Sequence, residues 1–290
     1  MLPFRRETVT LAAALFVARF VHYLATAILF GGAVFPLYGF ASRAADAQRA
    51  LPWLRPLLFH AAWLALFSGI GWFAFSAVEM SAGPAGIIAW WVSVFRLVLA
   101  AALVLLLLQR NATARSNYAV LAGSLILLAS IAWSGHAGSD SSVAATPMRA
   151  FHLVAAGVWT GALTVFARSA VSAVRQLRDD ELRALHYALE QFSGVGSVVV
   201  AVLLLTGIIL LGRPNTSDAY DRVLFAKLAM FGAMLFFAAA NRFWLTPKLS
   251  ATLDSSAGLA KAVGALRISL LAETALAGLV FAAVAWMEAL

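Results

Sequence analysis

The sequence predicts an all-α, polytopic membrane protein with eight transmembrane helices. The chain has 290 residues, of which 63% are hydrophobic and only 12% are charged. A soluble domain of this length carries about twice that charged fraction and divides its apolar residues into shorter pieces. Membrane-spanning strands would alternate apolar and polar residues, whereas stretches such as 97–108 are continuously apolar, so helices remain as the spanning structure.

Eight apolar runs are long enough to cross a bilayer, which takes about 20 residues in a helix. In chain order they are residues 12–40, 57–77, 87–108, 118–134, 150–171, 193–212, 223–245 and 264–287. The first run exceeds one upright crossing, so we expect residues 1–18 to form an apolar extension that reaches outward or lies along the surface. No small-residue cleavage site precedes Arg19, so we expect the first helix to be retained rather than removed as a signal peptide.

The net charge of +8 does not indicate a nucleic-acid partner, because the basic residues are concentrated in short loops. The loops after the first, third, fifth and seventh spans hold more Lys and Arg than the termini and the other loops. By the positive-inside rule, both termini should lie outside the cytoplasm. The chain has no cysteine, which excludes disulfides, thiolate metal sites and iron–sulfur clusters. It contains no nucleotide-binding loop, and no motif suggests an enzyme.

The two halves of the chain resemble each other. Residues 19–31 align with residues 149–161, so that an Arg, a His, an Ala and a Gly coincide at a constant offset of 130 residues. Near that offset, Arg96-Leu97 meets Lys227-Leu228, and after a short insertion Ser68-Gly69-Ile70 meets Thr206-Gly207-Ile208. We therefore predict two parallel four-helix repeats, residues 19–135 and 136–290, related by a pseudo-two-fold axis along the membrane normal. The functional site is expected near that axis.

Two histidines and a methionine are expected at one mouth of the protein. His136 ends the fourth span, His152 opens the fifth, and Met148 lies in the short loop between them. Imidazole and thioether ligands suit copper, although the two histidines could also simply bond loop carbonyls at the interface. His22 should approach His152 through the repeat and join the site, unless it is a packing histidine inherited by duplication.

A second group of residues could form a pathway through the membrane. Lys227, Met230 and Met234 share one stripe of the seventh span with Asn241, where methionine could also be apolar filler. Near the bilayer centre, Glu273 must be protonated or paired with a cation. It is therefore either a member of a structural ion pair or a carboxylate on a cation or proton path.

The partners considered for a structural ion pair with Glu273 are Lys227 and Arg96. His60, near the inner end of the second span, could be an exit ligand or a structural residue. His186 is expected in a polar loop beside Glu190, exposed to solvent and without a role in metal binding.

Several motifs resemble those of the copper resistance protein D (CopD) family of bacterial inner-membrane proteins. They are Ser134-Gly-His136-Ala, His152-Leu-Val-Ala-Ala-Gly-Val-Trp159-x-Gly161, Leu-Thr206-Gly-Ile, Lys227-Leu, Asn241-Arg-Phe-x-Leu-x-Pro247-x-Leu and Arg267-x-Ser-x-x-x-Glu273. The resemblance implies an eight-span protein that handles copper from the periplasm, commonly with a CopC-like periplasmic copper protein. Import towards the cytoplasm is the role usually proposed for the family. The chain departs from the family in its extra apolar segment and in having no fused soluble copper-binding domain.

Two other functions fit the same residues. A haem b-binding electron-transfer protein would use paired histidines on facing helices, as some four-helix bundles do. A docking scaffold for a periplasmic copper chaperone would move no ion itself. An absorption spectrum and a copper-uptake assay would separate these alternatives from a copper transporter.

Overall fold

The computed structural model describes residues 3–40, 51–77, 84–109, 113–134, 145–176, 179–211, 218–253 and 258–288. The long helices are α1 (Pro3–Gly39), α3 (Leu54–Ala77), α4 (Pro84–Leu108), α5 (Ala114–Ser130), α7 (Ala145–Gln176), α8 (Asp179–Leu211), α9 (Asp218–Ala240) and α11 (Leu259–Met287). The short helix η1 (Ile131–Trp133) extends α5, whereas η2 (Asn241–Leu245) and α10 (Thr246–Leu253) continue α9. Within the described residues there are eight spans long and apolar enough to cross a membrane and no strand, so the predicted fold class is confirmed.

Large apolar side chains cover the outside of the helix bundle. Val98, Ile208 and Phe225 are 64%, 66% and 71% exposed, respectively. A soluble protein would not leave so many such side chains in water, whereas a membrane protein places them against lipid. The outer faces of the spans therefore agree with a location in the bilayer.

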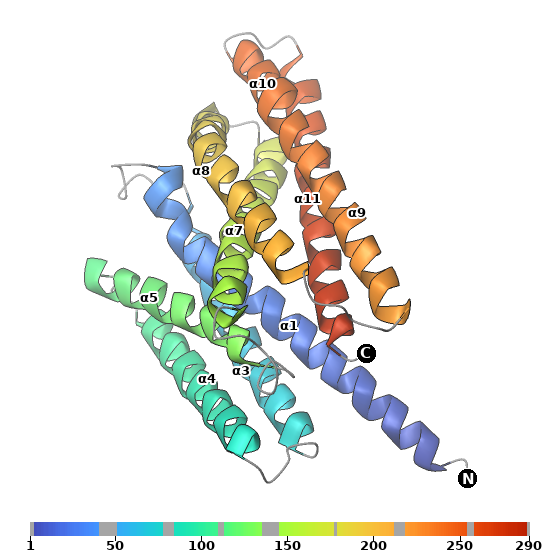
Figure 1. The fold of residues 1–290 in the computed structure, drawn as a ribbon. Coiled ribbons are helices and arrows are strands. Elements are labelled where there is room, and N and C mark those ends of the chain that lie inside the picture. The colour runs from blue at the N-terminus through green and yellow to red at the C-terminus, as the bar shows by residue number, and fades with distance from the viewer. Residues whose placement is uncertain are drawn as a thin grey trace.

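The helices α1 and α7 cross in the middle of the molecule (Figure 1). A Cβ atom on Gly31 would lie 2.0 Å from the Gly157 carbonyl oxygen, and one on Gly161 would lie 2.2 Å from the Gly31 carbonyl carbon. The two backbones therefore touch, and glycine is required at the crossing. Gly31 and Gly161 are also equivalent in the predicted repeat, and direct contact between equivalent residues is expected where a two-fold axis passes.

The other helices form one group around each of these central helices. α3 and α5 pack on α1, and α4 packs on α3 and α5; α8 and α11 pack on α7, and α9 packs on α11 (Figure 1). This arrangement agrees with the predicted halves, but the repeat and its boundaries, 19–135 and 136–290, remain predictions. The N-terminal extension is helical and continuous with the first span. Leu15 and Ala18, at its inner end, are buried in a cluster with Trp72.

Three local features differ from the sequence expectation. Pro147 and Met148 lie in the first turn of α7 rather than in a loop, because proline is compatible with a helix start. His186 lies on α8, four residues before Glu190, and not in a polar loop. The chain forms the π-helical turn η2 just before Pro247, whose ring would clash with the carbonyl four residues earlier in a regular helix.

Candidate functional site

His22 lies on α1 and is 1% exposed. Its Nδ1 atom is 3.0 Å from the carbonyl oxygen of Ala65 on α3. Because a carbonyl oxygen can only accept, Nδ1 must carry the ring proton of the neutral imidazole. Nε2 then holds the lone pair, and this buried atom has no hydrogen-bond partner within the described residues.

His152 lies near the start of α7 and is half-buried. Its Nδ1 atom is 2.8 Å from the hydroxyl oxygen of Thr206 on α8. The Thr206 hydroxyl donates its single proton to the Val202 carbonyl at 2.6 Å, so it accepts from Nδ1–H. His152 therefore also presents Nε2 as the nitrogen with the free lone pair.

Gly69 follows Ser68 beside the His22 ring, and Gly207 follows Thr206 beside the His152 ring. A Cβ atom on Gly69 would lie 3.3 Å from Cε1 of His22, and one on Gly207 would lie 3.8 Å from Cε1 of His152. Each imidazole therefore packs over a helix surface without a side chain. The two sites share this local construction, which supports the predicted repeat.

A basic side chain accompanies each histidine. Arg96 on α4 acts electrostatically on His22, and Lys227 on α9 acts on His152. A fixed positive charge near an imidazole opposes the binding of a cation there, and the opposition grows with the charge of the cation. Any metal at these histidines would therefore experience less repulsion as a monovalent ion.

Trp72 on α3 connects the residues around His22. Its ring makes edge contacts with the rings of His22 and Tyr23, with centroids 5.5 Å apart in both cases. The guanidinium carbon of Arg96 lies 4.6 Å from the Trp72 centroid, and that of Arg19 lies 5.9 Å away. The aromatic face stabilises two cations beside the histidine without adding a negative charge.

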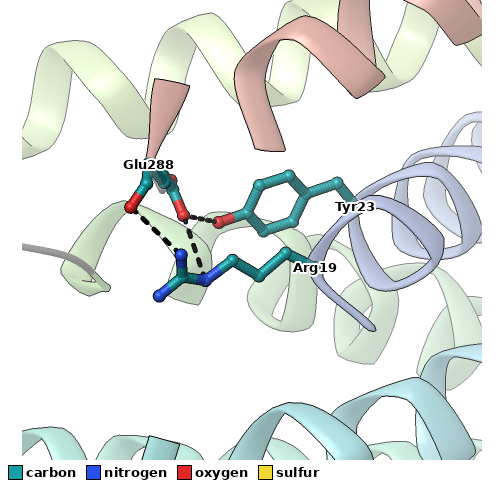
Figure 2. Close-up of polar contacts among 3 residues, drawn as sticks. All are labelled: Arg19, Tyr23 and Glu288. Atoms are coloured by element: carbon teal, nitrogen blue, oxygen red, sulfur yellow. Dashed lines mark hydrogen bonds and ion pairs between the residues drawn. The ribbon is translucent and has the colours of Figure 1, made fainter. Parts of the chain in front are cut away.

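Glu288, just after α11, joins the two ends of the chain (Figure 2). Its Oε2 atom accepts a hydrogen bond from the Tyr23 hydroxyl at 2.5 Å and lies 3.8 Å from Nε of Arg19, which also donates to the Glu288 backbone carbonyl. Burial raises the pKa of the Glu288 carboxyl above 4.5, whereas the Tyr23 hydrogen bond and the charges of Arg19, Arg96 and Arg149 partly oppose this shift. Arg19 and Arg149, which are equivalent in the predicted repeat, both act electrostatically on the Glu288 carboxylate.

The sequence did not single out Tyr23, Trp72 or Glu288 as site residues. Tyr23 directly follows His22 and lies in the repeated segment, so its position carried a signal. Trp72 and Glu288 carried none, because their proximity to His22 depends on how α3 and α11 pack against α1.

Glu273 on α11 is 2% exposed and binds two neutral donors. Its Oε1 atom accepts from Nε1 of Trp159, and its Oε2 atom accepts from Nδ2 of Asn241, both at 2.9 Å. The ion pair considered with Lys227 or Arg96 is wrong, since within the described part of the chain no cation bonds this carboxylate. The packing of α11 against α7 and η2 brings Glu273 to an indole and an amide instead.

The structure describes two of the three copper ligands expected at the outer mouth. Met148 and His152 are four residues apart on α7 and so share one helix face. His136 lies outside the described residues. The hydrogen bonds and ring contacts of His22 go to α3 and the bond of His152 goes to α8, so these two histidines share no partner among the residues that the structure describes. Within the described residues, no cluster of three or more His, Cys, Asp or Glu side chains could hold a metal ion.

The remaining expected pathway residues lie apart from one another. Met234 is buried, whereas Lys227 and Met230 are half-buried on the same helix, α9. His60 is exposed on α3, and its Nδ1 atom bonds the Pro56 carbonyl one turn earlier at 2.6 Å. Neither the pathway nor the exit role of His60 is tested by these positions.

The chain matches known protein families over most of its length. A family model described as copper resistance protein D matches residues 186–287, and one described as copper resistance protein D-like, N-terminal domain, matches residues 10–146. Copper resistance protein D from Pseudomonas syringae pv. tomato is 29% identical over 304 aligned positions, which cover 94% of each chain. The chain belongs to the copper resistance protein D family.

This membership agrees with the resemblance expected from the histidine-containing motifs. The expectation that the N-terminal apolar segment departs from the family is wrong, since the match to the N-terminal domain already begins at residue 10. The protein is therefore a bacterial copper resistance membrane protein with eight candidate spans in its described part. No solved structure gives a significant match to the chain.

Proposed function

We propose that the protein binds copper at the periplasmic side of the inner membrane and transports it towards the cytoplasm. The observation that carries the proposal is the state of the two histidines. His22 and His152 each direct an Nδ1–H into a hydrogen bond and keep Nε2 as a bare lone pair. Metal-binding histidines use the same device, because the second nitrogen fixes the tautomer and the ring orientation.

The outer copper site is proposed to consist of His152, Met148 and His136, with His22 contributing from the first half of the chain. Met148 is one helical turn before His152 on the same face, so imidazole and thioether can meet one ion. His136 would complete the set from the connection that precedes α7. An imidazole and thioether set is suited to copper.

The basic neighbours favour the cuprous ion at this site. Arg96 and Lys227 place a positive charge beside His22 and His152, respectively. Coulomb repulsion from a fixed charge is half as large for Cu(I) as for Cu(II) at the same distance. The thioether of Met148 favours the same oxidation state.

Inward movement is proposed to pass along α9 in the second half of the molecule and to end near the inner end of α3 in the first half. Met230 and Met234 on α9 offer thioethers at increasing depth, and His60 near the inner end of α3 is the proposed exit ligand. We propose that a CopC-like periplasmic protein delivers the copper and that both termini are periplasmic. Neither a nucleotide nor a nucleic acid takes part in this proposal.

Metal analysis and an absorption spectrum of the purified protein test the proposal. We expect bound copper and no Soret band; an intense Soret band would instead indicate a haem protein. His136→Ala and His152→Ala should each lower copper affinity by about 10- to 100-fold, because each removes one of three or four ligands. His186→Ala is the matched control, since His186 lies beside Glu190 on α8 and should not affect binding.

Proteoliposomes distinguish transport from docking. Copper should accumulate in vesicles that contain the wild-type protein, and uptake should fall in His152→Ala. A protein that binds copper or its chaperone but never moves copper across the vesicle membrane would be a scaffold, contrary to the proposal.

A further inference from the structure

A cavity of about 320 Å³ is lined by residues of α7, α8, α9, η2, α10 and α11. Its lining includes Trp159, Phe192, Asn241, Arg242 and Glu273. Beside the cavity α8 packs on η2 and α10, whereas α3, its counterpart in the predicted repeat, packs along α4. A space of this size suits a small ligand and its hydrogen-bonding groups.

The cavity contains a carboxylate at the middle of a membrane span. Glu273 is 14 residues from either end of the span Leu259–Met287, about 21 Å at the rise of an α-helix. The indole of Trp159 and the amide of Asn241 are its two partners, and neither carries a charge. An ionised carboxylate at this depth needs a cation, and these partners do not provide one.

Within the described lining, the cavity has one charged side chain besides that of Glu273. Arg242 lines the same cavity, but its guanidinium donates to the Ser193 carbonyl and the Ser197 hydroxyl, both on α8. None of α7, α8, α9 and α10 contributes a titratable side chain to the described lining. Tyr38 of α1 lies behind the lining, because its ring contacts the ring of the lining residue Phe192, with centroids 5.8 Å apart.

Asn241 offers the group that a protonated carboxyl would require. Its Nδ2 donates to Glu273, while its Oδ1 is buried and has no hydrogen-bond partner within the described residues. The residue is 7% exposed, and the π-helical turn η2 begins with it. Rotation about the terminal side-chain torsion exchanges the positions of the amide nitrogen and oxygen, so Asn241 can donate to a carboxylate or accept from a carboxylic acid.

We propose that Glu273 is an exchangeable proton-binding site and that Asn241 is its hydrogen-bond switch. In the ionised state, Nδ2–H of Asn241 donates to Oε2 of Glu273, as the structure has it. On proton loading, Oε2 becomes a hydroxyl, the amide rotates, and the new O–H donates to Oδ1. The proton enters through the cavity where Arg242, Ser193 and Ser197 reach the surface, and no redox step is involved.

Loading removes the net negative charge from the membrane interior, and release restores it. The site could therefore couple a proton gradient to movements of α11 against α9. The proposal does not depend on copper binding, because none of its residues belongs to the proposed copper ligands.

Labelling with dicyclohexylcarbodiimide, an apolar reagent that modifies protonated carboxyls in membranes, tests the proposal in the full-length protein. Mass spectrometry should find the adduct on Glu273, with labelling that falls about tenfold for each pH unit above the titration midpoint. Glu273→Gln should lose this adduct. The proposal would be overturned if Glu273 were not labelled at all over the whole pH range in which the protein remains folded.

Sodium ions provide a second arm of the experiment, because a carboxylate and an amide oxygen also suit a hard monovalent cation. Labelling at constant pH and ionic strength should be the same in sodium and in choline chloride. Protection by sodium would mean that a metal cation occupies the site, and the proton-binding proposal would be wrong. Glu273→Gln should still fold, because its amide can donate to Asn241 Oδ1 and its oxygen can accept from Trp159.

Infrared difference spectra between low and high pH test the switch itself. A carboxylic acid band should appear at low pH in the wild type and be absent in Glu273→Gln. A change in a side-chain amide band should accompany it and disappear in Asn241→Leu. A carboxyl signal without any amide signal would remove Asn241 from the mechanism.

Discussion

Replacement of Thr206 by Val should weaken copper binding without removing a copper ligand. The two side chains have nearly the same shape, but Val cannot accept the hydrogen bond that His152 Nδ1 now makes at 2.8 Å. A buried donor without a partner costs about 1–3 kcal/mol. Loss of the group that orients a metal-binding histidine typically lowers affinity by about 10- to 100-fold, or about 1.4–2.8 kcal/mol.

Competition between the purified protein and a cuprous chelator measures this effect. Thr164→Val is the matched control, because Thr164 donates to the Thr160 carbonyl of its own helix and, within the described residues, has no contact with either histidine, so it should leave affinity unchanged. Ser68→Ala gives an internal comparison. The Ser68 hydroxyl is 3.4 Å from His22 Nδ1, whereas the Ala65 carbonyl is at 3.0 Å and remains, so we expect no measurable loss.

The reasoning would be refuted if Thr206→Val and Thr164→Val had equal affinities for copper while His152→Ala was weakened. His152 would then bind copper without the fixed tautomer, and the hydrogen bond to Thr206 would have only a packing role. A parallel loss in all three variants would instead indicate a general disturbance of the fold.

Three further predictions concern stability, pH and orientation. Gly31→Ala should destabilise the protein in detergent by about 1–3 kcal/mol or more, since its Cβ would meet the α7 backbone. Gly232→Ala is the control and should be neutral or stabilising, because a Cβ there has nothing within 4 Å. Equal unfolding temperatures for the two variants would contradict the close crossing. The raised pKa of Glu288 means that the folded protein holds this proton more tightly than the unfolded chain does. The free energy of unfolding should therefore fall as pH rises from 4.5 through the folded pKa. Thermal unfolding measured across this range should show a flatter slope in Glu288→Gln. A reporter fused after Leu290 should be active only in the periplasm, and activity only in the cytoplasm would reverse every assignment of side.

The sequence predicted the spans because a bilayer imposes a length and a polarity on every helix that crosses it. Within the described residues, the number of spans could therefore be read without knowledge of packing, whereas the span limits could not: the sixth span, expected at 193–212, extends over Leu182–Leu211. The repeat also produced useful expectations, since it related Ser68 to Thr206 before the structure placed each beside a histidine. His136 could be proposed from its motif but lies outside the described residues.

Local sequence could not identify the partners of buried polar groups. The opposite charges of Glu273, Lys227 and Arg96 made an ion pair reasonable, but the carboxylate meets Trp159 and Asn241 instead. These contacts depend on the rotation of α11 about its axis and on the π-helical turn that directs Asn241 inward.

The sequence by itself determined that this protein is a helical membrane protein, with eight spans in its described part, and it predicted a histidine, a hydroxyl and a basic residue at equivalent places in two halves. Burial in lipid selects apolar runs one helix at a time, so these properties need no tertiary information. Only the tertiary structure decided that Glu288 joins Arg19 and Tyr23 and that α8 leaves a cavity beside Glu273. Such contacts join residues far apart in the chain, and they are set by how closely helices approach, which glycines at crossings and short-range packing control.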